Sequence, residues 1–90
     1  MPAQRKSKPR SPDHAALAQA IELLIAEDAQ MTQESVAAES GMNIKQVNAL
    51  VRGQSNPTYT TLLRLCEGLH VRLGELLTRA DAMRDKRSRR

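Results

Sequence analysis

The sequence predicts an all-α fold of five short helices, and two observations lead to this prediction. First, Tyr59 is the one aromatic residue among 90, so the core must be built from aliphatic side chains, a composition that favours helices over strands. Second, five apolar stretches recur at helical spacing, each bounded by capping residues, glycine or proline. A chain of this length suits one small domain and excludes a large enzyme.

The first helix is expected over residues 12–28. Ser11 is a favourable N-cap and Pro12 suits the first helical position. His14 follows in the first turn and has no partner group nearby in the sequence. One apolar face is expected to reach the core, formed by Leu17, Ile21, Leu24 and Ile25.

The next two helices are short and are joined by a tight turn. Thr32 caps the second helix, and Gly41 stops it as a residue able to take positive φ. Asn43 caps a third helix over residues 43–52, with Gln46 placed to complete a capping box. The buried stripe of this third helix is Val47, Leu50 and Val51. Two such helices form a helix-turn-helix pattern, whose second helix can enter the major groove of DNA.

The remaining apolar stretches predict two more helices after a turn at residues 53–58. Thr58 opens the fourth helix, whose core stripe is Leu62, Leu65, Cys66 and Leu69. The fifth helix is marked by Val71, Leu73, Leu76 and Leu77. We expect its three leucines to divide between the core and a dimer seam. Cys66 and His70 have the spacing of a metal pair, but two ligands without a second pair predict no metal site.

The net charge of +4 lies entirely at the two ends of the chain. Residues 1–11 predict a disordered basic arm, and residues 80–90 predict a frayed basic tail. Between them, residues 12–79 form the predicted helix-turn-helix domain. Residues 13–77 carry four basic and eight acidic side chains, a net charge of −4. Attraction to phosphates is therefore expected to rest largely on the ends.

Several classes of function are excluded by the composition. There is no glycine-rich phosphate loop and no nucleophile with supporting residues, so we expect neither an enzyme nor a cofactor. No apolar run approaches the roughly 18 residues of a membrane span, so we expect no membrane partner. A single cysteine suits a reducing compartment. These features together predict a cytoplasmic protein.

The faces of the third helix indicate which side chains read DNA. Opposite the buried stripe lie Lys45, Ala49 and Arg52, with Asn48 beside them. Lys45 can donate to guanine or to phosphate, and Asn48 carries the amide that adenine requires. Ala49 lets the helix lie close to the base edges, whereas Arg52 at the helix end is better placed for a phosphate.

From Met31 to Leu77 the chain resembles the phage-repressor-like (Cro/repressor, XRE-type) helix-turn-helix family. The motifs that carry the resemblance are TQES, the glycine of GM, VNAL, RG, NPT and the leucines after them. The segment is similar to the DNA-binding domain of lambda repressor through QESVA, GM and VxAL, and the basic arm resembles the arm of that protein. The resemblance implies a compact five-helix, lambda-repressor-like DNA-binding domain.

The resemblance also implies roles for individual residues. Gln33 would bind phosphate, Asn43 and Arg52 would contact the DNA backbone, and the loop after the third helix would approach DNA. The full set of candidate DNA-contacting residues is Gln33, Asn43, Ile44, Lys45, Gln46, Asn48, Ala49, Arg52, Gln54, Ser55 and Asn56, with Arg5, Lys6, Lys8 and Arg10 of the arm.

Three residues depart from the family pattern. Ile44 replaces a base-reading Gln of lambda repressor, which implies a different operator. His70 replaces the usual Gly at the end of the fourth helix, where a left-handed conformation is required. Arg72 replaces the usual cap of the fifth helix, which should weaken that helix start by roughly 1 kcal/mol.

The sequence leaves three functions open. The first is a prokaryotic or phage transcriptional regulator, nucleoid-associated, that binds double-stranded DNA as a homodimer with half-sites about 34 Å apart. The second is an antitoxin or other protein-interaction module on the same fold, with a toxin or another regulator as partner, supported by the acidic middle of the chain. The third is a non-specific nucleoid binder.

Overall fold

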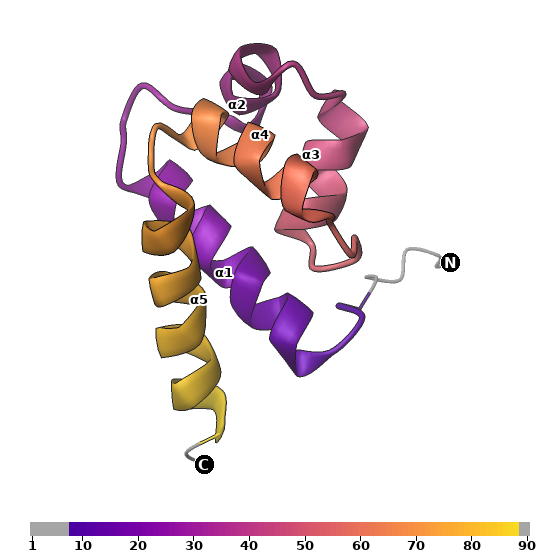
Figure 1. Cartoon of the computed structure of the whole chain (residues 1–90), viewed down its shortest axis with the longest axis vertical. Coiled ribbons are helices and arrows are strands. Elements are labelled where there is room, and N and C mark those ends of the chain that lie inside the picture. Colours follow the sequence, from indigo (N-terminus) through magenta and orange to yellow (C-terminus); the bar gives the residue numbers. More distant parts are fainter. Residues whose placement is uncertain (1–7, 89–90) are drawn as a thin grey trace, which may run out of the picture.

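The computed structural model describes residues 8–88, and this part of the chain folds into five helices (Figure 1). The all-α prediction is confirmed. The helices are α1 (Pro12–Ala26), α2 (Gln33–Ser40), α3 (Ile44–Val51), α4 (Tyr59–Leu69) and α5 (Leu73–Ser88).

Side chains cap the first four helices at the residues that the sequence indicates. In each cap an oxygen of the residue before the helix accepts a backbone N–H of the first turn, which satisfies a donor that the helix itself leaves unpaired. The acceptor–donor distances run from 2.7 to 3.2 Å. The predicted caps that are confirmed are Ser11, Thr32, Asn43 and Thr58.

Every helix contributes a fully buried side chain to one aliphatic core. In Figure 1, α1 and α5 run side by side, and α2, α3 and α4 group together across one end of this pair. Each helix has at least one large aliphatic side chain with a relative exposure of 0%, namely Ile21, Val36, Val47, Leu65 and Leu76. The aliphatic core expected from the composition is therefore confirmed, and it fixes the orientation of α3.

The backbones of α2 and α4 approach each other closely at Gly68. A Cβ atom at this position would lie 2.5 Å from the carbonyl oxygen of Val36, so only glycine fits. Two residues later His70 ends α4 in the left-handed conformation, with φ of 61°. The prediction that His70 tolerates this conformation is confirmed. Its Nε2 atom lies 2.5 Å from Oε1 of Glu39, which links the end of α4 to α2.

The structure contradicts the predictions for both ends of the domain. The tail expected to be frayed from residue 80 is helical through Ser88, because α5 continues without a break beside α1. Arg84 extends this contact, with its guanidinium 4.0 Å from Asp13 of α1, and it also lies 3.1 Å from Asp81 within α5. The disordered arm expected through residue 11 is likewise wrong for residues 8–11, since Arg10 donates its backbone N–H to the Gly53 carbonyl at 2.8 Å.

The leucines of α5 divide between two environments. Leu76 is fully buried and closes the core, whereas Leu77 is 42% exposed. Leu73 is partly buried and packs against the edge of the core. The expected contribution to the core is confirmed, and the dimer seam stays a prediction.

Candidate nucleic-acid interface

A glycine turn and a capping box set the start of α3. Gly41 ends α2 with φ of 72°, which turns the chain sharply into the next helix. Lys45 then donates its backbone N–H to Oδ1 of Asn43 at 2.7 Å, and Asn43 donates its own N–H to Oε1 of Gln46 at 3.1 Å. This capping box uses one side-chain oxygen of Asn43 and of Gln46, and it leaves their amide NH2 groups as the donors available to DNA.

The two sides of α3 differ as the sequence predicts. Val47, Leu50 and Val51 are buried in the core. Lys45 and Arg52 are exposed, and Asn48 and Ala49 are half-buried. Ile44, the first residue of the helix, is an aliphatic side chain with 36% of its surface exposed. The outer side of α3 therefore combines two cations, an amide and apolar groups, the chemistry that reads base edges and phosphates.

Two further predicted contacts flank α3 on neighbouring elements. Gln33 is the first residue of α2 and is half-buried. The loop after α3 holds Gln54 and Ser55, which are half-buried, and Asn56, which is exposed. All the predicted DNA-contacting residues from Gln33 to Asn56 therefore lie on α2, α3 and the segments next to α3.

Two side chains of this loop bind the N-terminal segment. Gln54 donates its amide Nε2–H to the carbonyl of Lys8 at 3.5 Å. Asn56 has Oδ1 at 3.2 Å from Nε2 of His14. The sequence predicts these loop residues as DNA contacts and gives no sign of the contacts to residues 8–14.

The contacts of His14 were not predicted from the sequence. The expectation that it has no partner nearby in the sequence is wrong, because its Nδ1 atom lies 2.7 Å from Oγ of Ser11. The contact to Ser11 has a local signal, since a residue three positions after an N-cap lies above the cap. The contact to Asn56 spans 42 residues of sequence and has no local signal.

Two of the four basic residues of the arm, Lys8 and Arg10, lie in the described part of the chain. Lys8 and Arg10 are exposed, and the backbone around them is bonded to Gly53 and Gln54 at the end of α3. Both cations are therefore anchored beside the predicted DNA-reading helix. Arg5 and Lys6 lie outside the described residues.

Away from α3, the fold shifts the pKa of individual ionisable groups. A hydrogen bond from Arg79 holds the pKa of Glu27 below its usual value, across a distance of 2.7 Å between α5 and α1. Burial raises the pKa of the Cys66 thiol. Among residues 8–88 no three His, Cys, Asp or Glu side chains gather as metal ligands. Nor does any described helix combine the length and apolar character needed to cross a bilayer.

The arrangement of α2 and α3 defines a class of protein. Two short helices meet at a glycine turn, and the second buries an aliphatic stripe while it presents polar groups outward, which is the helix-turn-helix. The profile of the helix-turn-helix family matches residues 25–76, and the chain belongs to this family. The resemblance identified from the sequence motifs is thereby confirmed.

Curated and solved relatives agree with this assignment. Over 51 residues the chain is 43% identical to the HTH-type transcriptional regulator y4dJ of Sinorhizobium fredii, a match that covers 57% of this chain and 66% of that protein, just under two thirds. The restriction-modification controller protein C.AhdI of Aeromonas hydrophila superposes with a TM-score of 0.69 at 27% identity, over 73% of this chain and 98% of that one.

A third relative extends the agreement in fold. The clp gene regulator ClgR of C. glutamicum superposes with a TM-score of 0.70 at 21% identity, over 78% of this chain and 90% of that one. The first two relatives are described as a transcriptional regulator and a controller protein. This agrees with the prediction that the chain is not an enzyme.

Proposed function

We propose that this protein is a sequence-specific transcriptional regulator that binds double-stranded DNA by placing α3 in the major groove. The observation that carries the proposal is the outer side of α3. Lys45, Asn48 and Ala49 are accessible on a short helix whose opposite side is locked into the core. A regulator of this kind acts on the nucleoid in the cytoplasm of a prokaryotic cell, or on a phage genome.

Base reading is assigned to the middle and the start of α3. Lys45 donates to guanine O6 and N7, and Asn48 pairs its amide with adenine N6 and N7. Ala49 lets the helix approach the base edges. Ile44, exposed at the helix start, offers an apolar surface to a thymine methyl group.

Phosphate contacts are assigned to the groups around α3. Arg52 at the helix end and Gln33 at the start of α2 are the neighbouring donors, and Lys8 and Arg10 stand beside the following loop. Contacts of this kind fix the register on the duplex without reading its sequence. The cations among them make binding dependent on salt.

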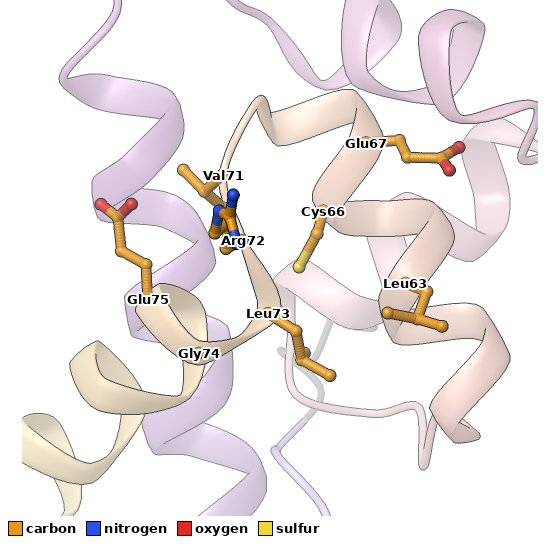
Figure 2. Close-up of a pocket in the computed structure, with 8 residues that line it drawn as sticks. All are labelled: Leu63, Cys66, Glu67, Val71, Arg72, Leu73, Gly74 and Glu75. Atoms are coloured by element: carbon orange, nitrogen blue, oxygen red, sulfur yellow. The ribbon is translucent and has the colours of Figure 1, made fainter.

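The proposed homodimer forms on the exposed leucines of α4 and α5. Leu63 and Leu77 are 39% and 42% exposed, and Leu73 lies four residues before Leu77 on the same side of α5. Leu63 and Leu73 line one hollow between the two helices (Figure 2). In that view Cys66 and Leu73 point into the hollow and Glu75 points away from it. We assign this apolar surface to a second copy of the chain, because paired half-sites require two recognition helices.

Selection of bound sequences from random duplex DNA tests the proposal. Enrichment of a palindrome with half-sites about 34 Å apart is expected for a dimer that reads bases. Binding without enrichment contradicts sequence-specific reading and favours a nucleoid binder. Absence of DNA binding favours the protein-interaction module, with a toxin or another regulator as the partner to seek.

Point variants then test the assignment of α3. Lys45→Ala and Asn48→Ala should each reduce the preference for the selected operator over random DNA by roughly 10- to 100-fold, the value of a good base contact. Lys86→Ala is the matched control, since it removes one exposed charge from the end of α5. It should leave the preference unchanged. If Lys45→Ala and Asn48→Ala keep the same preference for the operator as Lys86→Ala, base reading is not carried out by this side of α3.

The dimer surface has a separate test. Leu77→Glu changes an exposed side chain, so the monomer should fold as before while self-association is lost. Sedimentation equilibrium should show a dimer for the unchanged chain and a monomer for the variant. Unaltered association of Leu77→Glu would exclude this surface as the seam.

A further inference from the structure

The loop that follows α3 is enclosed by a distant part of the chain. Gly53 is buried, and a Cβ atom on it would lie 3.0 Å from Cβ of Pro9 and 3.1 Å from the carbonyl oxygen of His14. The Arg10 N–H donates to the Gly53 carbonyl at 2.8 Å. Residues 8–14 therefore cover the loop, and they form a clasp over it that includes the first turn of α1.

His14 connects this clasp to the DNA side of the loop through a directed chain of hydrogen bonds. Its Nδ1 atom lies 2.7 Å from the Ser11 hydroxyl, and its Nε2 atom lies 3.2 Å from Oδ1 of Asn56. The amide oxygen of Asn56 can only accept, so Nε2 of His14 carries a proton and donates it to Oδ1.

This bond determines which end of the Asn56 amide faces outward. Oδ1 is engaged by His14, so the NH2 group is the end that remains for another acceptor. The acceptors that DNA presents beside a recognition helix are phosphate oxygens and base edges. An amide held in this orientation before binding loses less conformational entropy when DNA arrives.

We propose that His14 is a positioning residue for DNA binding, which acts through Asn56 by holding its amide with the NH2 group toward the nucleic acid. The proposal rests on the proposed DNA-binding function. It adds a specific task for a residue on α1, outside the helix-turn-helix itself, and it assigns the clasp a role besides carrying positive charge.

Two substitutions of His14 separate the hydrogen bond from the volume of the ring. His14→Phe keeps a flat ring and removes the donor, and it should weaken operator binding by roughly two- to tenfold, the value of one hydrogen bond. His14→Gln places an amide NH2 group near the position of Nε2 and should restore most of the affinity. The slope of affinity against salt should stay unchanged in both variants, because neither removes one of the cations assigned to phosphates.

A double-mutant cycle tests whether His14 acts through Asn56. In an Asn56→Ala background, His14→Phe should have no further effect on operator affinity, because the group that it positions is absent. If the two losses multiply, or if His14→Gln binds as weakly as His14→Phe, the positioning role is refuted. A purely structural role would instead lower the urea midpoint of DNA-free His14→Phe in proportion to its loss of affinity.

The positioned amide can also be observed without DNA. In nitrogen-15 spectra of the free protein, the side-chain NH2 signals of Asn56 should shift in His14→Phe and return close to their original positions in His14→Gln. Signals that are the same in all three proteins would overturn the proposal. If Lys45→Ala leaves operator binding intact, the DNA-binding assignment of α3 fails instead. The two failures are therefore distinguishable.

Discussion

The two turns that bound α3 share one backbone conformation and differ in what surrounds them. Gly41 before the helix and Gly53 after it both have φ of 72°. A Cβ atom on Gly41 would meet nothing within 4 Å, whereas one on Gly53 would lie 3.0 Å from Pro9 Cβ and 3.1 Å from the His14 carbonyl oxygen, closer than most such contacts. The entry to α3 is therefore open to solvent, and its exit is enclosed by the N-terminal clasp.

This difference shows how the position of α3 is determined at each end. The entry is encoded locally, because Gly41 and the Asn43–Gln46 capping box are within six residues of one another. The exit depends on contacts with residues 8–14, about forty positions earlier in the chain. A change in the N-terminal segment is thus expected to affect the exit of α3 and to leave its entry unchanged.

Gly53→Ala should produce the largest effect. Alanine here must keep a left-handed conformation, which costs about 1–2 kcal/mol. Its methyl group also presses against Pro9 and the His14 carbonyl, which must shift slightly, and this adds about 1–3 kcal/mol of overpacking. Urea denaturation should therefore show a loss of roughly 2–5 kcal/mol. A loss no greater than that of Gly41→Ala would mean that the clasp does not constrain the turn.

Gly41→Ala is the matched substitution with the same φ and open space. It should cost about 1–2 kcal/mol, from backbone strain alone. The difference between the two glycine variants in the same urea titration measures the contribution of the enclosure. A Gly41→Ala variant as unstable as Gly53→Ala would show that the entry is equally constrained.

Arg10→Pro tests the hydrogen bond between the clasp and the exit turn. Proline has no N–H, so the 2.8 Å bond to the Gly53 carbonyl is lost. Stability should fall by about 1 kcal/mol in a urea titration. Arg10→Gln loses the same charge but keeps the N–H, and its stability should equal that of the unchanged chain. Equal stability of both variants would exclude this bond as a support of the turn.

Substitutions in the ion pair between α1 and α5, away from both turns, should have the smallest effect on stability. The pKa of Glu27 is held below its usual value by the hydrogen bond from Arg79, so the stabilisation is present above the pKa of the unfolded chain. It is lost as pH falls through the lower pKa of the folded protein. Glu27→Gln should therefore flatten the acid side of the curve of stability against pH. Arg79→Gln should produce the same flattening, and an unchanged acid side would contradict the pairing.

Sequence patterns correctly predicted the features that depend on residues close together along the chain. The caps at Thr32 and Asn43 follow from residues within one helical turn, as does the positive φ of Gly41. The buried stripe of α3 follows from helical periodicity, and its opposite side then identifies Lys45 and Asn48 as the candidates for base reading.

The remaining features depend on contacts that no local pattern specifies. His14 finds Asn56 because α1 and the loop after α3 meet in the folded domain. The segment predicted as a frayed tail is helical because α5 packs along α1 and contains no glycine or proline beyond Gly74. In both places the charge or polarity of the sequence indicated solvent exposure, while tertiary packing determined the outcome.

The most direct test of base reading by α3 is a change of specificity at Ile44, the exposed first residue of that helix. Ile44→Gln introduces an amide that can pair with adenine N6 and N7. Random-duplex selection should be carried out in parallel with the unchanged chain and with this variant. We expect both to select palindromes of the same spacing, with adenine newly preferred at one position in each half-site of the variant. Identical base preferences at every position would contradict the placement of α3 in the major groove.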